Sequence, residues 1–122
     1  MIHDMSHTDP RHAELERLRI AVRLALHPRE PWRIPAYVEL AEALARSRKD
    51  GWQLLEHTFH NLIASANDPL LPFAWRVSCI DHTYLPYRAM YTHPDSGRHS
   101  ALLHELGRRL ATTRIFEPGR HD

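Results

Sequence analysis

Residues 35–68, PAYVELAEALARSRKDGWQLLEHTFHNLIASAND, decide the fold because they contain two helical patterns joined by a very short turn. In the first half, apolar residues recur at intervals of three and four, which predicts a helix over residues 35–48. Asp-Gly-Trp-Gln at residues 50–53 is a variant capping box, and it predicts that a second helix starts at once. Asn-Asp-Pro at residues 67–69 stops that helix. The two segments are therefore expected to form a helical hairpin with a tight connection.

The segment before the hairpin predicts another helix. Asp9 is suited to cap it and Pro10 to occupy its first position, where a missing N–H group costs nothing. The helix is expected to end at His27-Pro28, and three prolines then stiffen the connector that leads to the hairpin. Its buried face is expected to contain Leu15, Leu18, Val22 and either Ala25 or Leu26.

The segment at residues 70–95 allows two interpretations. Three prolines interrupt it, and two runs of alternating apolar residues fit a short β-hairpin: Trp75, Val77 and Cys79, then Tyr87, Ala89 and Tyr91. Other apolar residues of the same segment fit a short helix: Phe73, Val77 and Ile80. Apolar runs this short cannot be assigned by periodicity alone, so both interpretations stay open.

A last helix is expected after the turn at residues 95–97, capped by Ser96 or Ser100. The sequence thus predicts a mainly α protein: a compact four-helix domain with an irregular or short β-hairpin insertion between the third and fourth helices. A single helical domain is expected at residues 9–116. A flexible N-terminal lead at residues 1–8 and a C-terminal tail at residues 117–122 are expected to flank it.

The charge balance argues against a nucleic-acid-binding protein. Among the 122 residues, sixteen basic side chains oppose fifteen acidic ones, and the two signs are interspersed. Non-specific nucleic-acid binding requires that several phosphates be neutralised together, which this pattern does not favour. All basic residues but Lys49 are arginine, which is typical of a GC-rich bacterial genome.

Cys79 is the only cysteine, so the chain has no internal disulfide and no cysteine-based zinc cluster. A single cysteine is typical of a reducing compartment, and no segment has the roughly 20 consecutive apolar residues that span a bilayer. We therefore expect a cytoplasmic protein without a membrane partner.

His57 and His60 are the candidate metal ligands, because a spacing of three places both imidazoles on one side of a helix. The metal would be zinc or another divalent transition metal. A third ligand would have to come from elsewhere in the chain: His82, His93, His99, His104, Asp81 or Asp95. Two solvated histidines explain the pattern more simply, so no cofactor is our first expectation.

Catalysis is not favoured either. Ser-Cys-Ile-Asp-His at residues 78–82 unites a thiol, a carboxylate and an imidazole, but catalytic Cys and His normally come from separate segments. Cys79 lies in an apolar run, where a buried structural thiol is more common. The four glycines are isolated, so no phosphate-binding loop is expected.

Residues 70–91 hold five of the ten aromatic residues together with two arginines, residue types that are enriched where proteins bind proteins. Stiff aromatic rings lose little entropy on docking. The alternative is that the same rings close the core over the helices. The candidate partner-binding residues are Trp75, Arg76, Tyr84, Tyr87, Arg88 and Tyr91.

These observations favour a non-catalytic intracellular protein-binding module, such as an inhibitor, adaptor or regulator of another bacterial or mobile-element protein. It would act by occlusion or recruitment, and its oligomeric state stays open. One alternative is a metal-binding protein or metal-dependent enzyme that uses His57 and His60. A third is a DNA-binding regulator with a helix-turn-helix, although the second helix of the hairpin offers no Arg or Lys for phosphates.

Overall fold

The structure is a computed structural model that describes residues 9–117, and this part of the chain is helical without a strand. The expected lead at residues 1–8 and most of the expected tail lie outside the described residues. In chain order the elements are α1 (Pro10–Leu24), α2 (Arg33–Arg46), α3 (Gly51–Ala66), α4 (Phe73–Tyr91), the 3-10 helix η2 (Ser96–His99) and α5 (Ser100–Thr112). None of these helices is long and apolar enough to cross a membrane.

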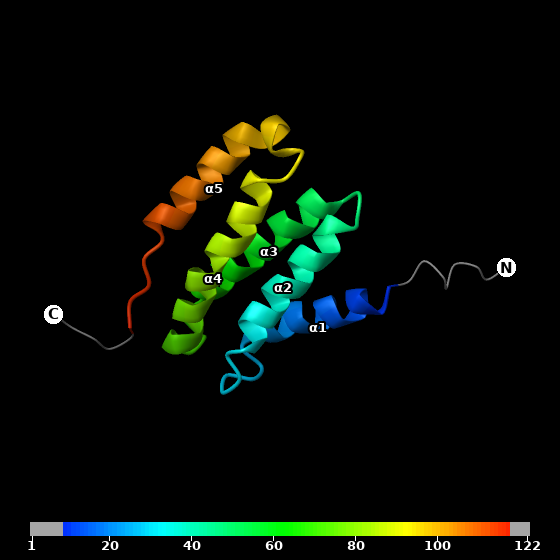
Figure 1. Cartoon of the computed structure of the whole chain (residues 1–122). Coiled ribbons are helices and arrows are strands. Elements are labelled where there is room, and N and C mark those ends of the chain that lie inside the picture. The colour runs from blue at the N-terminus through cyan, green and yellow to red at the C-terminus, as the bar shows by residue number, and fades with distance from the viewer. Residues whose placement is uncertain (1–8, 118–122) are drawn as a thin grey trace.

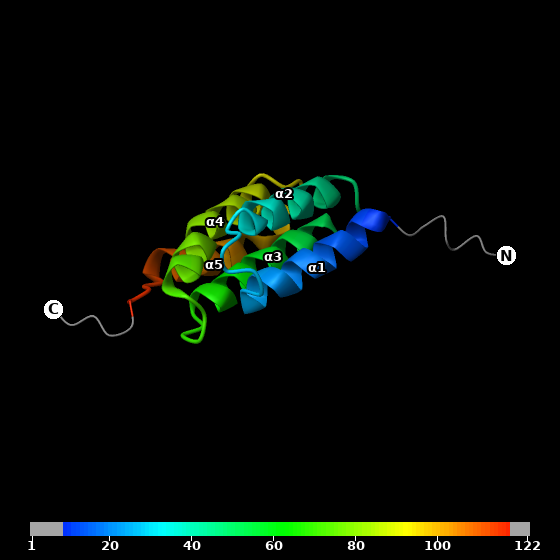
Figure 2. The same ribbon diagram turned by 90° about the horizontal axis from the view of Figure 1, so that it is seen from below.

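The central helix is α3, which packs against α1, α2 and α4. The helices α2 and α4 run in the same direction and α3 runs back between them, while α5 packs along the outer side of α4 (Figure 1). Seen from below, α2 and α4 form one layer, and α1 and α3 form a second layer beneath it (Figure 2). The helical class is thus confirmed, with five α-helices in the described range rather than four.

The caps of α1 follow from its sequence. The Asp9 carboxylate accepts the Arg11 backbone N–H at 2.9 Å, and Pro10 occupies the first helical position, as predicted. The helix ends earlier than expected, because Ala25 adopts a left-handed conformation with φ 50°. Of the two alternatives for the last position of the apolar face, Ala25 is buried and Leu26 is exposed.

The hairpin interpretation of residues 70–95 is wrong, because α4 is one continuous helix from Phe73 to Tyr91. The helix interpretation is confirmed, but the helix is longer than expected, and Phe73, Val77 and Ile80 are partly rather than fully buried. The buried face follows intervals of four, four, three and four, through Trp75, Cys79, Thr83, Pro86 and Met90. Pro86 removes one backbone donor from the helix interior, and burial of this face against the other helices outweighs that loss.

The core has two clusters of buried side chains. The first joins α1, α2 and the C-terminal end of α3 to the N-terminal half of α4. The second joins α3, α5 and Ala45 of α2 to the C-terminal half of α4. The α4 helix therefore contributes one face to both clusters, as α3 does, and leaves its opposite face outward. Buried members of the second cluster include Phe59, Ile63, Met90, Leu103 and Leu106.

Candidate functional site

Two of the six predicted partner-binding residues belong to the core. Trp75 is 2% exposed, and its indole N–H donates to the Val22 carbonyl at 2.9 Å. Arg76 is 8% exposed, and its Nε donates to the Ala66 carbonyl at 2.8 Å, at the C-terminal end of α3. The prediction that these two side chains face outward is wrong, because the first turn of α4 is anchored to α1 and α3 through them.

The other four predicted residues lie on the outward side of α4. Tyr84 is 52% and Tyr91 61% exposed, and the Arg88 guanidinium lies 5.9 Å from the centre of the Tyr84 ring. Tyr87 is half-buried; its ring lies 6.3 Å from that of Phe59, and its hydroxyl donates to the Leu103 carbonyl at 3.3 Å. Intervals of three and four place the three tyrosines in one row along the helix.

This row forms one wall of a groove between α4 and α5. Two hollows, of about 390 Å³ and about 640 Å³, share Tyr87 and His104 in their linings and so adjoin at these residues. We call their combined lining the α4–α5 groove. It consists of Tyr84, Tyr87, Tyr91, Ser96, Gly97, Ser100, Leu103, His104, Gly107, Arg108, Leu110 and Ala111.

Small residues on α5 give the groove its depth. Ser100, Gly107 and Ala111 lie on the side of α5 that faces the tyrosine row, together with His104. A Cβ atom at Gly107 would lie 2.5 Å from the Tyr87 hydroxyl oxygen. Glycine at this position therefore lets Tyr87 lie flat enough against α5 to reach the Leu103 carbonyl. No local pattern predicts this wall, because it depends on how α5 packs on α4.

The groove is lined by aromatic, aliphatic and polar side chains, and no carboxylate is part of its lining. Arg108 is its one permanently charged side chain, and Glu105 on the outer side of α5 holds that guanidinium at 2.7 Å. The same contact lowers the pKa of Glu105 and raises that of Arg108. Such a lining suits van der Waals, aromatic and hydroxyl contacts with another molecule and contains no nucleophile paired with a base.

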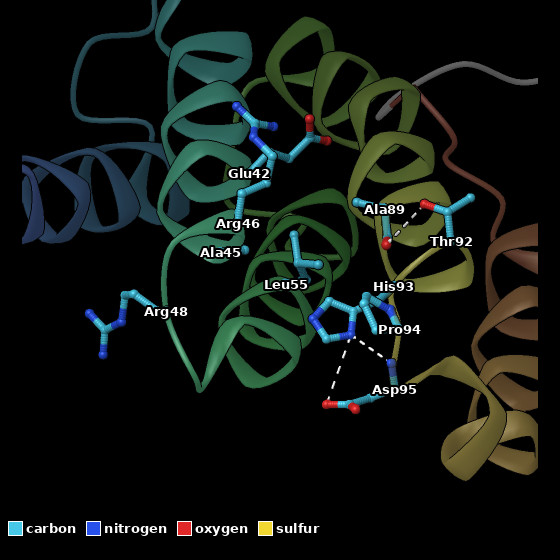
Figure 3. Close-up of a pocket in the computed structure, with 10 residues that line it drawn as sticks. All are labelled: Glu42, Ala45, Arg46, Arg48, Leu55, Ala89, Thr92, His93, Pro94 and Asp95. Carbon is cyan, nitrogen blue, oxygen red and sulfur yellow. Dashed lines mark hydrogen bonds and ion pairs between the residues drawn. The ribbon is translucent and has the colours of Figure 1, made fainter.

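Another hollow, of about 650 Å³, lies between the C-terminal ends of α2 and α4 (Figure 3). Most of its charged groups already have partners. The His93 ring points into the hollow, and its Nδ1 accepts the Asp95 backbone N–H at 3.0 Å, while Arg48 points away and is held by Asp50 at 2.7 Å. Burial raises the pKa of Glu42 on the rim. Cations and anions alternate around this hollow, so it has no clear preference for one ligand charge.

The candidate metal ligands are not brought together with a third one. The His60 Nε2 lies 3.6 Å from a Glu56 oxygen, and the Arg109 guanidinium lies 3.5 Å from the other ring nitrogen of His60. His57 is exposed on the same helix. Within residues 9–117, no group of three or more His, Cys, Asp or Glu side chains is arranged to hold a metal ion.

The helix-turn-helix interpretation meets a physical difficulty. A recognition helix must present one full face to DNA, whereas α3 is central and buries nine of its sixteen residues. Its exposed residues include Gln53 and His57, and the helix itself has no Arg or Lys.

No family model, curated protein or solved structure matches this chain.

Cys79 has the environment of a structural thiol. It is fully buried, and burial raises the pKa of the thiol to about 12. The neighbouring His82 is oriented by the Ser78 carbonyl, 2.8 Å from its Nδ1.

We expect native protein to release no thionitrobenzoate from Ellman's reagent within minutes at pH 8, and one equivalent in 6 M guanidinium chloride, because the Cys79 thiol is buried until the protein unfolds. A fast reaction of the native protein would contradict this burial.

Proposed function

We propose that this chain is a protein-recognition module that binds a segment of another protein in the α4–α5 groove. The observation that carries the proposal is the tyrosine row, which leaves two rings more than half exposed beside a hollow lined by small residues. A tyrosine side chain has only two torsion angles, so little conformational entropy is lost when a partner covers it. Burying a Tyr ring at the centre of an interface can contribute 2 kcal/mol or more.

The mode of action we propose is non-catalytic. Serine hydroxyls and the His104 imidazole line the groove, but no hydrogen bond pairs them in the described part of the chain. The chain would therefore act by covering a functional surface of its partner or by bringing the partner to a third molecule. It would thus serve as an inhibitor, adaptor or regulator. The single buried cysteine fits a reducing cytoplasm, which is where we place this role.

The test is a comparison of three baits in affinity capture from extracts of the host cell. These are the wild type, the double variant Tyr84→Ala/Tyr91→Ala and the control Trp32→Ala. Trp32 is a matched choice because it is 58% exposed, at the start of α2 and outside the groove lining. We expect a partner that the wild type and the control retain and that the double variant loses.

The captured partner is then titrated with each purified chain. We expect the dissociation constant to rise at least about 30-fold in the double variant, the equivalent of 2 kcal/mol. Its circular dichroism spectrum and melting temperature should stay close to wild type, because both rings are exposed. A partner that binds the double variant as tightly as the wild type would place the binding surface elsewhere.

A further inference from the structure

The outward face of α4 carries a regular stripe that extends beyond the groove. Its members alternate at intervals of three and four residues, the spacing with which one helix lies along another. All are exposed except Val77, which is half-buried. We call this set the α4 stripe: Ala74, Val77, Asp81, Tyr84, Arg88 and Tyr91.

Two members of the α4 stripe carry opposite charges that have no ion-pair partner among residues 9–117. Asp81 and Arg88 are seven residues apart, two helical turns, so both project from the same side with Tyr84 between them. The Arg88 guanidinium rests over the Tyr84 ring. On the neighbouring α2, Glu42 faces Arg88 across a small hollow and interacts with it electrostatically, and no ion pair joins the two side chains among the described residues. Two solvated, unpaired charges on an apolar stripe remain available to an approaching surface.

The order of these charges makes the α4 stripe complementary to itself. In a two-fold dimer every contact occurs twice: if residue i of the first copy contacts residue j of the second, then residue j of the first contacts residue i of the second. An antiparallel copy centred close to Tyr84 therefore brings Asp81 of each chain opposite Arg88 of the other. The two Asp81–Arg88 pairs lie about 10 Å from each other along the helix axis. The Tyr84 rings meet near the axis. Tyr91 extends over the N-terminal half of the facing helix, where Ala74 and Val77 leave room.

We propose that a second copy of this chain docks on the α4 stripe, with the two α4 helices antiparallel across a two-fold axis at Tyr84. This self-association goes beyond the proposed recognition function and does not depend on which protein occupies the groove. Both events use Tyr84 and Tyr91, so the dimer and a groove-bound partner exclude each other. The charge pair, by contrast, lies outside the groove lining and can be altered on its own.

The test measures self-association of the full chain by sedimentation equilibrium from 1 μM to 1 mM. The variants are Asp81→Arg, Arg88→Asp and the double swap Asp81→Arg/Arg88→Asp. Each single reversal places like charges at both pairs, and we expect the dimer dissociation constant to rise at least tenfold. The double swap restores opposite charges, and we expect a value within threefold of wild type. The control Arg17→Asp reverses an exposed charge on α1 and should leave the constant unchanged.

Three results would overturn the proposal. If the wild type stays monomeric up to 1 mM, no second copy docks on the α4 stripe. A dimer that both single reversals leave intact must use another face. A folded double swap that does not recover the dimer shows that Asp81 and Arg88 do not meet. If a reversal lowers the melting temperature, the neutral variants Asp81→Asn and Arg88→Gln replace it, and each should weaken the dimer at least threefold. Loss of the dimer with groove binding intact would leave the proposed function standing.

Discussion

Replacement of Trp75 by alanine will lower the free energy of unfolding by about 3–5 kcal/mol, the range for large aromatic residues in well-packed cores. Trp75 is 2% exposed and belongs to the cluster that joins α1, α2, α3 and α4. The variant loses the ring, creates a cavity and removes the donor to the Val22 carbonyl. Urea unfolding followed by far-ultraviolet circular dichroism measures the change, because tryptophan fluorescence would itself be altered by the substitution.

Two matched variants give this result its meaning. Trp75→Phe keeps most of the packing and loses the hydrogen bond, so it should cost about 1–3 kcal/mol. Trp32→Ala removes an exposed indole and should change stability by no more than about 0.5 kcal/mol. If Trp75→Ala and Trp32→Ala had equal costs, Trp75 would be a surface residue and the placement of α4 would be wrong.

The second large effect is expected at Gly51, where alanine should destabilise the protein by about 3 kcal/mol, at the upper end of the usual cost of overpacking. A Cβ atom there would lie 2.2 Å from the Ala45 carbonyl oxygen and 3.0 Å from its carbonyl carbon. Both atoms are backbone of α2, so no side-chain rotation relieves the clash, and the tight turn from α2 to α3 must open.

The sign of this change is informative, because alanine normally stabilises a helix relative to glycine by up to about 1 kcal/mol. Gly97→Ala is the control, since nothing lies within 4 Å of the Cβ atom it adds. We expect it to be neutral or slightly stabilising. Thermal unfolding of both variants compares them directly, and a Gly51→Ala protein as stable as the wild type would contradict the close approach of α2 and α3.

Local signals in the sequence predicted the first three helices well, and α4 poorly. The Asp9 cap and the short turn before Gly51 act within a few residues, so they can be predicted from the chain alone. The predicted capping box is wrong, because the Asp50 side chain makes no cap hydrogen bond and is held by Arg48 at 2.7 Å. Pro86 suggested an interruption in α4, because proline removes a donor and usually breaks a helix. Only tertiary packing reveals that its ring is buried with Cys79 and Met90 and that the helix continues through it.

The candidate site on α4 could be predicted only in part from the sequence. Composition identified the aromatic segment but not the face of each ring, so Trp75 and Arg76 were placed outside with the tyrosines. The intervals from Trp75 through Cys79 to Met90, had they been followed, separate the buried face from the row of tyrosines. The groove wall on α5 could not be predicted, because no local pattern relates Gly107 to Tyr87, twenty residues earlier.

The central claim is that the tyrosine face of α4 is where another polypeptide docks. Replacing Tyr91 by the photo-crosslinking residue p-benzoylphenylalanine in living cells tests this claim most directly, with the same replacement at Trp32 as the comparison. The account predicts covalent adducts with a second chain, either a partner or another copy, at position 91 and not at position 32. Adducts of the same kind at both positions, or none at position 91, would contradict it.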